Sequence, residues 1–302
     1  MFARLAFWTL LTALLQPTTL LAQWTPDRLL GAANLAKDLE FPAEPSSLGF
    51  FSTPRMALYK PEGPGPFPAI VLHHQCAGLG IGPRQNQSML TWAREAVAQG
   101  YVALLIDSLG PRNVDTVCMG LRGGVNFMRG VKDALQAARY LQKFEFVDKN
   151  RIALAGYSWG AMIGVLASGK LWSSALGSGE RFAAVVSFYP GCFAIRPPNS
   201  TPYEILNMDV DRPLLVLMGE KDTETPPTDC VPKLEALRAA GALVEWHVYP
   251  ETTHCWDCQQ LDGFSKTDVR GNHVVYRYDR QVTQDSKRRL FEFLQKHLPA
   301  RP

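Results

Sequence analysis

A serine between two glycines, placed where an apolar run gives way to a helix-like run, is the feature that most restricts the fold of this chain. The segment Gly156 to Gly160 reads G-x-S-x-G, with Ser158 at its centre, and it joins the apolar residues 151–155 to residues 161–167. A strand that turns directly into a helix strains the backbone at the serine, and Cβ atoms at the flanking positions would crowd the turn. The pattern predicts a sharp strand–turn–helix unit with an accessible serine hydroxyl.

Predicted strands and helices alternate along most of the chain. Strands are expected at 56–59, 68–73, 101–106, 151–155, 182–188, 213–218 and 244–249, and helices at 92–99, 131–143, 161–167, 231–240 and 286–297. Several of these strands are nearly continuous apolar runs, which is typical of a parallel sheet buried on both faces. We therefore expect an α/β fold with a mostly parallel central sheet and helices on both faces.

The length of 302 residues favours one large domain over two. Residues 23–50 are rich in Pro, Leu and Ala and are expected to pack on this domain as an N-terminal leader. Residues 258–281 are polar and form a predicted excursion, with a hairpin around 273–278. The net charge of +3 is small, and Lys and Arg are scattered, so nucleic acid is not an expected partner.

Residues 1–22 are predicted to be a signal peptide. Arg4 supplies a positive charge, residues 5–15 are uncharged and mostly apolar, and small or polar residues lead to a plausible cleavage site after Ala22. The alternatives are an uncleaved membrane anchor or a buried first helix, although the apolar run is too short to span a bilayer comfortably. We expect an exported protein, periplasmic or secreted, with a mature chain of residues 23–302 and no stable membrane span.

Six cysteines are compatible with export, because an oxidising compartment allows them to pair. Six cysteines permit 15 pairings, so the spacing alone does not decide among them. Cys255 and Cys258 have CxxC spacing, but the chain has neither a second CxxC nor paired histidines. Structural disulfides are therefore expected, and a metal site is not.

A serine nucleophile requires a base that accepts its proton. His254 is the strongest candidate, because it lies in a loop after the late strand 244–249, near the carboxyl edge of the expected sheet. His273, in the polar excursion, is the main competitor. His247 lies inside the strand and is expected to pack or to face solvent, and His297 is expected on the surface of the last helix.

The base in turn requires a carboxylate that orients it and stabilises its charged form. Asp222 follows strand 213–218 and precedes a loop, so it also lies at the carboxyl edge of the sheet; Glu220 is the alternative. The chain order Ser158, Asp222, His254 is that of α/β-hydrolases. These three residues are the predicted catalytic set.

Such a site also needs backbone donors for a developing oxyanion. The N–H of Trp159, the residue after the serine, is the first expected donor. The second is expected from the loop 73–80 that follows an early strand, and the amide of Cys76 is our choice.

Taken together, these segments resemble the dienelactone hydrolase family of α/β-hydrolases. The resemblance covers roughly Phe50 to Leu298 and is carried by residues 71–78, 156–160, 219–222 and 249–254. It implies hydrolysis of a small-molecule ester or lactone through an acyl-enzyme, without a metal or another cofactor.

The chain also departs from that family. The dienelactone enzymes use a cysteine where this chain has Ser158, and a glutamate of the oxyanion loop is matched here by Gln75. Those enzymes bind a substrate carboxylate through arginines. Arg112 lies one residue from the first of these positions, as a candidate substrate-binding residue or a structural loop arginine, and Cys258 lies near the second. A dienelactone substrate is therefore not expected.

The cysteines resemble those of secreted relatives, which implies the pairs Cys76–Cys118, Cys192–Cys230 and Cys255–Cys258. Two other functions remain open at this level. The same triad serves peptidases and acyltransferases, and a chain with this fold can also be a catalytically silent binding protein. The presence of all three predicted catalytic residues favours an enzyme.

Overall fold

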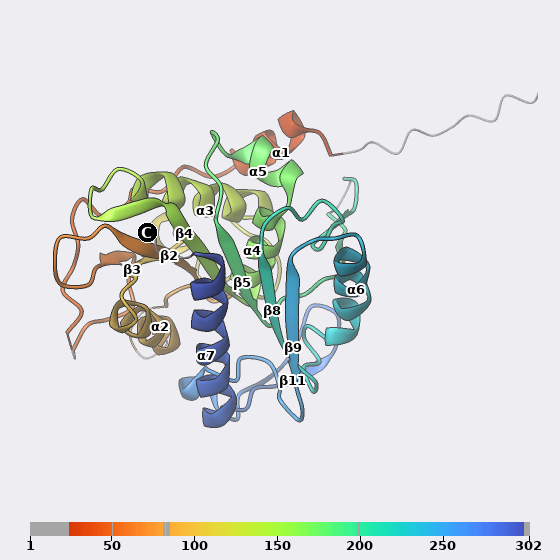
Figure 1. Cartoon of the computed structure of the whole chain (residues 1–302). Coiled ribbons are helices and arrows are strands. Elements are labelled where there is room, and N and C mark those ends of the chain that lie inside the picture. Colours follow the sequence, from red (N-terminus) through yellow and green to blue (C-terminus); the bar gives the residue numbers. More distant parts are fainter. Residues whose placement is uncertain (1–23, 50, 81, 83–84, 198–199, 299–302) are drawn as a thin grey trace, which may run out of the picture.

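A mostly parallel sheet forms the centre of the protein (Figure 1). The computed structural model describes residues 24–49, 51–80, 82, 85–197 and 200–298. The predicted signal peptide lies outside these residues.

Within the described residues the central sheet has seven strands in the order β1-β3-β2-β4-β5-β8-β9. They are β1 (Ala57–Tyr59), β2 (Phe67–His73), β3 (Val102–Ile106), β4 (Val147–Tyr157), β5 (Ala184–Phe188), β8 (Leu214–Gly219) and β9 (Val244–Tyr249). Among the strands of this sheet that the structure describes, the edge strand β1 alone runs antiparallel to its neighbour, and every other pairing is parallel. The residues of β3, β5 and β8 are buried throughout, which explains their continuous apolar sequences.

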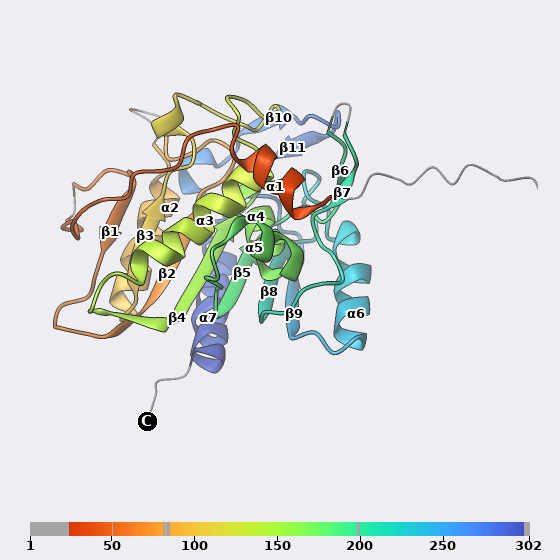
Figure 2. The same cartoon turned by 90° about the horizontal axis from the view of Figure 1, so that it is seen from above.

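Helices cover both faces of the sheet (Figures 1 and 2). One face carries α1 (Pro26–Ala33), α3 (Phe127–Leu141), α4 (Trp159–Ser168), α5 (Lys170–Leu176) and α6 (Val231–Ala239). The other carries α2 (Gln87–Ala98) and α7 (Arg280–His297). The α/β prediction is therefore confirmed. Among the described residues, none of the helices has the length and apolar character that crossing a membrane requires.

Helix α1 of the leader packs against other helices of the domain. Helix α1 begins after Thr25, whose hydroxyl accepts the N–H of Arg28, and it lies against α3 and α5. Leu29 and Ala33 of α1 are fully buried. The leader is thus part of the hydrophobic core on that face.

Several element boundaries differ from the prediction. Helix α7 starts at Arg280, because the side chain of Asp279 accepts the N–H groups of Gln281 and Val282 and caps the helix. Its first turns are polar, so the apolar periodicity starts later than the helix. Helix α2 was predicted too short. Helix α5 was not predicted, and neither was the small hairpin of β6 (Ala194–Ile195) and β7 (Tyr203–Glu204).

Candidate active site

The predicted strand–turn–helix unit is formed by β4, Ser158 and α4. Ser158 has φ 50° and ψ −112°, a left-handed conformation that side chains rarely adopt. A Cβ at Gly156 would overlap the carbonyl oxygen of Gly160, and a Cβ at Gly160 would overlap that of His73. Both glycines are therefore required by close backbone packing around the serine.

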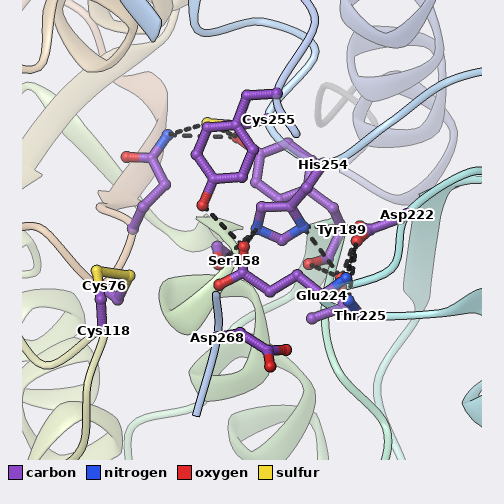
Figure 3. Close-up of polar contacts among 12 residues, drawn as sticks. Cys76, Cys118, Ser158, Tyr189, Asp222, Glu224, Thr225, His254, Cys255 and Asp268 are labelled. Carbon is purple, nitrogen blue, oxygen red and sulfur yellow. Dashed lines mark hydrogen bonds and ion pairs between the residues drawn. A yellow bond between two sulfur atoms is a disulfide. The ribbon is translucent and has the colours of Figure 1, made fainter. Parts of the chain in front are cut away.

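The three predicted catalytic side chains form one hydrogen-bonded chain (Figure 3). The Ser158 hydroxyl lies 2.9 Å from His254 Nε2, and His254 Nδ1 lies 2.7 Å from Asp222 Oδ2. They come from the carboxyl ends of β4, β9 and β8, which are brought together because parallel strands end at the same edge. All three residues are buried, with 6% of Ser158 exposed.

Asp222 is held by its own loop. Its Oδ1 accepts the backbone N–H groups of Glu224 and Thr225 at 2.9 and 2.8 Å, and its Oδ2 accepts the Thr225 hydroxyl at 2.7 Å. Thr225 Oγ1 also lies 3.1 Å from His254 Nδ1. Thr225 was not predicted, because no local pattern marks it and its role depends on the fold of this loop.

The carboxylate sets both the tautomer and the basicity of His254. Because Nδ1 donates its hydrogen to Asp222, Nε2 is free to accept the hydrogen of Ser158. Burial lowers the pKa of His254, but the charges of Asp222 and Glu224 raise it more, so that this pKa lies above its ordinary value of 6.5. A base with this environment is suited to take a proton from a serine hydroxyl.

The competing residues lie elsewhere. His273, in β11 (His273–Val275), is exposed, and its carbonyl accepts the Thr223 hydroxyl. The ring of His247 packs edge-on against Tyr249. Glu220 accepts the N–H of Glu251, so Asp222 is the carboxylate that contacts the base.

The loop after β2 holds the predicted oxyanion donor in place. Ser108 donates its N–H to His74 Nε2 at 3.0 Å, so the ring hydrogen is on Nδ1, which donates to the Gln75 carbonyl at 2.6 Å. That carbonyl and the N–H of Cys76 belong to one planar trans peptide and point in opposite directions. Burial lowers the pKa of His74, which keeps its ring neutral. His74 thus fixes the orientation of the Cys76 amide.

A cavity of about 520 Å³ lies over Ser158 and His254. Its walls are largely apolar and include Ala77, Met119, Leu261, Phe264 and the cysteine pairs 76–118 and 255–258. Among the described residues that line the cavity, Lys266 is the one with a permanent charge. The polar excursion predicted after Cys258 therefore forms one wall of the site.

Arg112, which was a candidate substrate-binding residue, lies in a buried ion pair instead. Its guanidinium binds both oxygens of Asp133, at 2.6 and 2.8 Å, and donates to the carbonyls of Lys37 and Ser108. Its side chain is 2% exposed and is not among the residues that line the cavity. Arg112 joins the leader to α3 and does not reach the site, so its role in this structure is structural.

Three disulfides brace loops around the site, with the pairs that the resemblance implied. Cys76–Cys118 holds the loop that carries the predicted oxyanion donor, Cys192–Cys230 joins the loop after β5 to the start of α6, and Cys255–Cys258 directly follows His254. Donor atoms of Cys255, Asp257 and Cys258 lie within 4.8 Å of one another. Their two sulfurs are bonded to each other, so they are not thiolate ligands for a metal.

Tyr189 is a second contact of His254, and no pattern in the sequence predicted it. It follows β5 with φ 44°, and its ring packs edge-on against His254 with the centroids 4.7 Å apart. Its hydroxyl donates to the buried carboxylate of Asp257 at 2.7 Å, and Trp92 Nε1 donates to the other oxygen. Burial raises the pKa of Asp257. These hydrogen bonds hold the Tyr189 ring in place, and that ring packs against the ring of His254.

Known proteins with similar sequences bear one recurring name. A protein named as a carboxymethylenebutenolidase in Salmonella typhimurium is 27% identical over 68% of this chain and 74% of its own length. A protein of the same name in Yersinia pestis is 23% identical over 77% of this chain and 79% of its own.

Solved structures share the fold. A dienelactone hydrolase structure from Klebsiella pneumoniae has a TM-score of 0.61 at 20% identity, covering 80% of this chain and 93% of that one. An esterase from Thermogutta terrifontis, solved with propionate bound, has a TM-score of 0.59 at 17% identity, covering 82% and 91%. Residues 55–298 match the dienelactone hydrolase family, in agreement with the range that the motifs predicted. The chain therefore belongs to the dienelactone hydrolase family and is a hydrolase with the α/β-hydrolase fold.

Proposed function

We propose that this protein hydrolyses carboxylic esters or lactones with Ser158 as nucleophile, His254 as general base and Asp222 as the group that orients His254. The hydrogen-bonded chain from Asp222 through His254 to Ser158, at the floor of an apolar cavity, is the observation that carries this proposal. Membership of the dienelactone hydrolase family favours hydrolysis over the peptidase, acyltransferase and binding-protein alternatives.

The geometry supports a two-step reaction. Ser158 Oγ attacks the substrate carbonyl while its proton passes to His254 Nε2, and the same proton then goes to the leaving alcohol as the C–O bond breaks. Water repeats the sequence on the acyl-enzyme, and the acid is released. The N–H groups of Cys76 and Trp159 are the proposed oxyanion donors, and each such donor stabilises a transition state by about 3 kcal/mol.

The cavity favours a substrate without a net charge. Its wall is largely apolar, the ammonium group of Lys266 already pairs with Glu224 at 2.7 Å, and Arg112 lies elsewhere. A substrate carboxylate would thus lose its hydration without gaining an unpaired cation among these residues. We propose neutral esters or lactones with apolar groups as the substrate class.

We also propose that the protein is exported. The signal-like sequence of residues 1–22 supports this proposal, and so do the three disulfides, because such bonds persist mainly in oxidising compartments. Mass spectrometry of the protein from periplasmic and culture fractions tests it: a mature N-terminus near Gln23 is expected, and full-length cytosolic protein contradicts it.

A fluorophosphonate probe and a series of p-nitrophenyl esters of graded chain length test the catalytic assignment. Wild type should be labelled and should hydrolyse esters, whereas Ser158→Ala should lose both properties. Normal labelling of Ser158→Ala would refute the nucleophile. The chain length at which kcat/KM declines reports how large an acyl group the cavity accepts.

A further inference from the structure

A second carboxylate, that of Glu224, faces His254 at the nitrogen that Asp222 does not contact. Glu224 Oε2 lies 3.9 Å from His254 Nε2, the nitrogen that is bonded to Ser158 (Figure 3). The Glu224 side chain is 14% exposed. At this distance Glu224 does not replace Ser158 as hydrogen-bond partner, but its charge acts strongly on the ring through a largely buried space.

The excursion after Cys258 holds this carboxylate in place. The Tyr276 hydroxyl donates to Glu224 Oε2 at 2.8 Å, and Lys266 Nζ, on β10 (Ser265–Thr267), lies 2.7 Å from Oε1. Arg270, in the turn of the same hairpin, donates to the Glu224 backbone carbonyl. Three side chains of one hairpin therefore converge on one residue, which fixes its carboxylate beside the base.

Resting on the proposed function, we propose that Glu224 is a positioning residue that stabilises the charged form of His254 from its Nε2 side, and that Lys266 sets the strength of this effect. When Nε2 takes the proton of Ser158, the resulting imidazolium lies between two carboxylates. Lys266 pairs with the far oxygen of Glu224 and thereby weakens the field that reaches His254. Removing Glu224 and removing Lys266 must therefore change the basicity of His254 in opposite directions.

Other polar and charged groups also lie around His254. Those that face it from the packed elements are Asp222 and the Thr225 hydroxyl from the loop after β8, Tyr189 from the loop after β5, Ser158 from the turn between β4 and α4, buried Asp257 from the adjacent turn, and Tyr276 and Lys266 from the excursion. Burial raises the pKa of Glu224, but His254, Lys266 and Tyr276 lower it more, so that the net shift is downward. Glu224 is thus ionised where the enzyme titrates its base.

The pH dependence of kcat/KM for a neutral p-nitrophenyl ester tests the proposal. Glu224→Gln should move the acid-side midpoint down by about one pH unit, since a charge at this distance shifts a pKa by roughly that amount or more. The value of kcat on its high-pH plateau should fall less than about tenfold, because the rate of proton transfer depends only in part on the pKa of the base. Lys266→Met should move the midpoint upward.

Glu220→Gln is the matched control. It removes the same charge from the same loop, but Glu220 is 49% exposed and contacts Lys221 and the N–H of Glu251. Its midpoint should equal that of wild type. The downfield Nδ1 proton resonance of His254, followed against pH, measures the same shift without turnover, and the thermal midpoint of each variant reports whether it is folded.

An unmoved midpoint in folded Glu224→Gln, or equal shifts in Glu224→Gln and Glu220→Gln, overturns the proposal. A downward shift in Lys266→Met does so as well. Failure of the proposed function is distinguishable, because it would appear as activity retained by Ser158→Ala. If Ser158→Ala is inactive but Glu224→Gln and Lys266→Met leave the midpoint unmoved, the role of Glu224 is refuted and the proposed function is not.

Discussion

The ring of His74 donates its Nδ1 hydrogen to the carbonyl oxygen of Gln75 at 2.6 Å. This bond determines which way the following amide, that of Cys76, can point, because carbonyl and N–H are opposed in a trans peptide. His74 belongs to the same loop as Cys76 and stacks on the Trp159 ring with the centroids 5.7 Å apart. One buried side chain thus contacts the segments that supply both proposed oxyanion donors.

We expect His74→Leu to lower kcat by about a hundredfold with little change in KM, since the loss of an oxyanion donor acts on the transition state. His74→Asn is the matched variant, because its side-chain amide places a donor near the position of Nδ1 and should recover part of kcat. Steady-state kinetics measure both. Equal losses in the two variants, or a loss of thermal stability without a loss of kcat, would argue against this role.

Thr225 is expected to stabilise the orientation of Asp222. Thr225→Val removes a hydroxyl that donates to Asp222 Oδ2 and should lower kcat about tenfold, as expected for one hydrogen bond to a charged group. Thr225→Ser keeps the hydroxyl and should remain close to wild type. If Thr225→Ser is as impaired as Thr225→Val, the methyl group and its packing matter instead.

The wild-type enzyme should lose activity as the pH falls through the pKa of His254. Only neutral His254 can accept the Ser158 proton, so kcat/KM declines on the acid side, with its midpoint at the pKa of the free enzyme. Asp222 and Glu224 raise that pKa against the opposing effect of burial, which places the midpoint above 6.5. A kcat/KM profile measured from pH 5 to 9 (about the usual range for such a base) checks this, and a midpoint below 6.5 contradicts it.

Arg112 should matter for stability and not for substrate choice. Arg112→Met leaves the buried carboxylate of Asp133 with Arg129 as its remaining partner and should cost about 3 kcal/mol. Arg288→Met, at a side chain that is 51% exposed, should cost little. Urea denaturation compares the two variants. A selective rise in KM for a carboxylate-bearing ester in Arg112→Met would restore the substrate role.

Removal of two of the disulfides should have different effects, one mainly on stability and the other mainly on activity. The Cys192–Cys230 bond closes a loop of 38 residues and the Cys255–Cys258 bond one of 3, so loop entropy assigns them about 4 and about 2 kcal/mol. The double variant C192A/C230A should therefore lose more stability, whereas C255A/C258A should lose more kcat, because its bond directly follows His254. Denaturation and kinetics on both variants test the contrast; the reverse ranking would refute it.

Much of the fold could be predicted because its signals are local. The apolar run before Ser158 predicts a buried strand, and the glycines at 156 and 160 predict the turn, since each reports crowding in its own neighbourhood. The start of α7 was predicted wrongly, because Asp279 starts the helix before its apolar pattern begins. Asp222 and His254 could be placed because each follows a recognisable strand of a parallel sheet, and such strands end at a common edge.

The remaining parts of the site depend on contacts between distant segments. Glu224 meets Lys266 across 42 residues, and Arg112 reaches Asp133 and the leader carbonyl of Lys37, 75 residues away. A charged side chain has the same local sequence signal in solvent and in a buried pair, so its partner is decided only when the chain packs. The sequence by itself determined the chain order of the predicted catalytic residues, the strands that they follow and the serine turn. The tertiary structure decided which carboxylates face His254 and that Arg112 lies outside the cavity, because burial and charge pairing arise only in the folded chain.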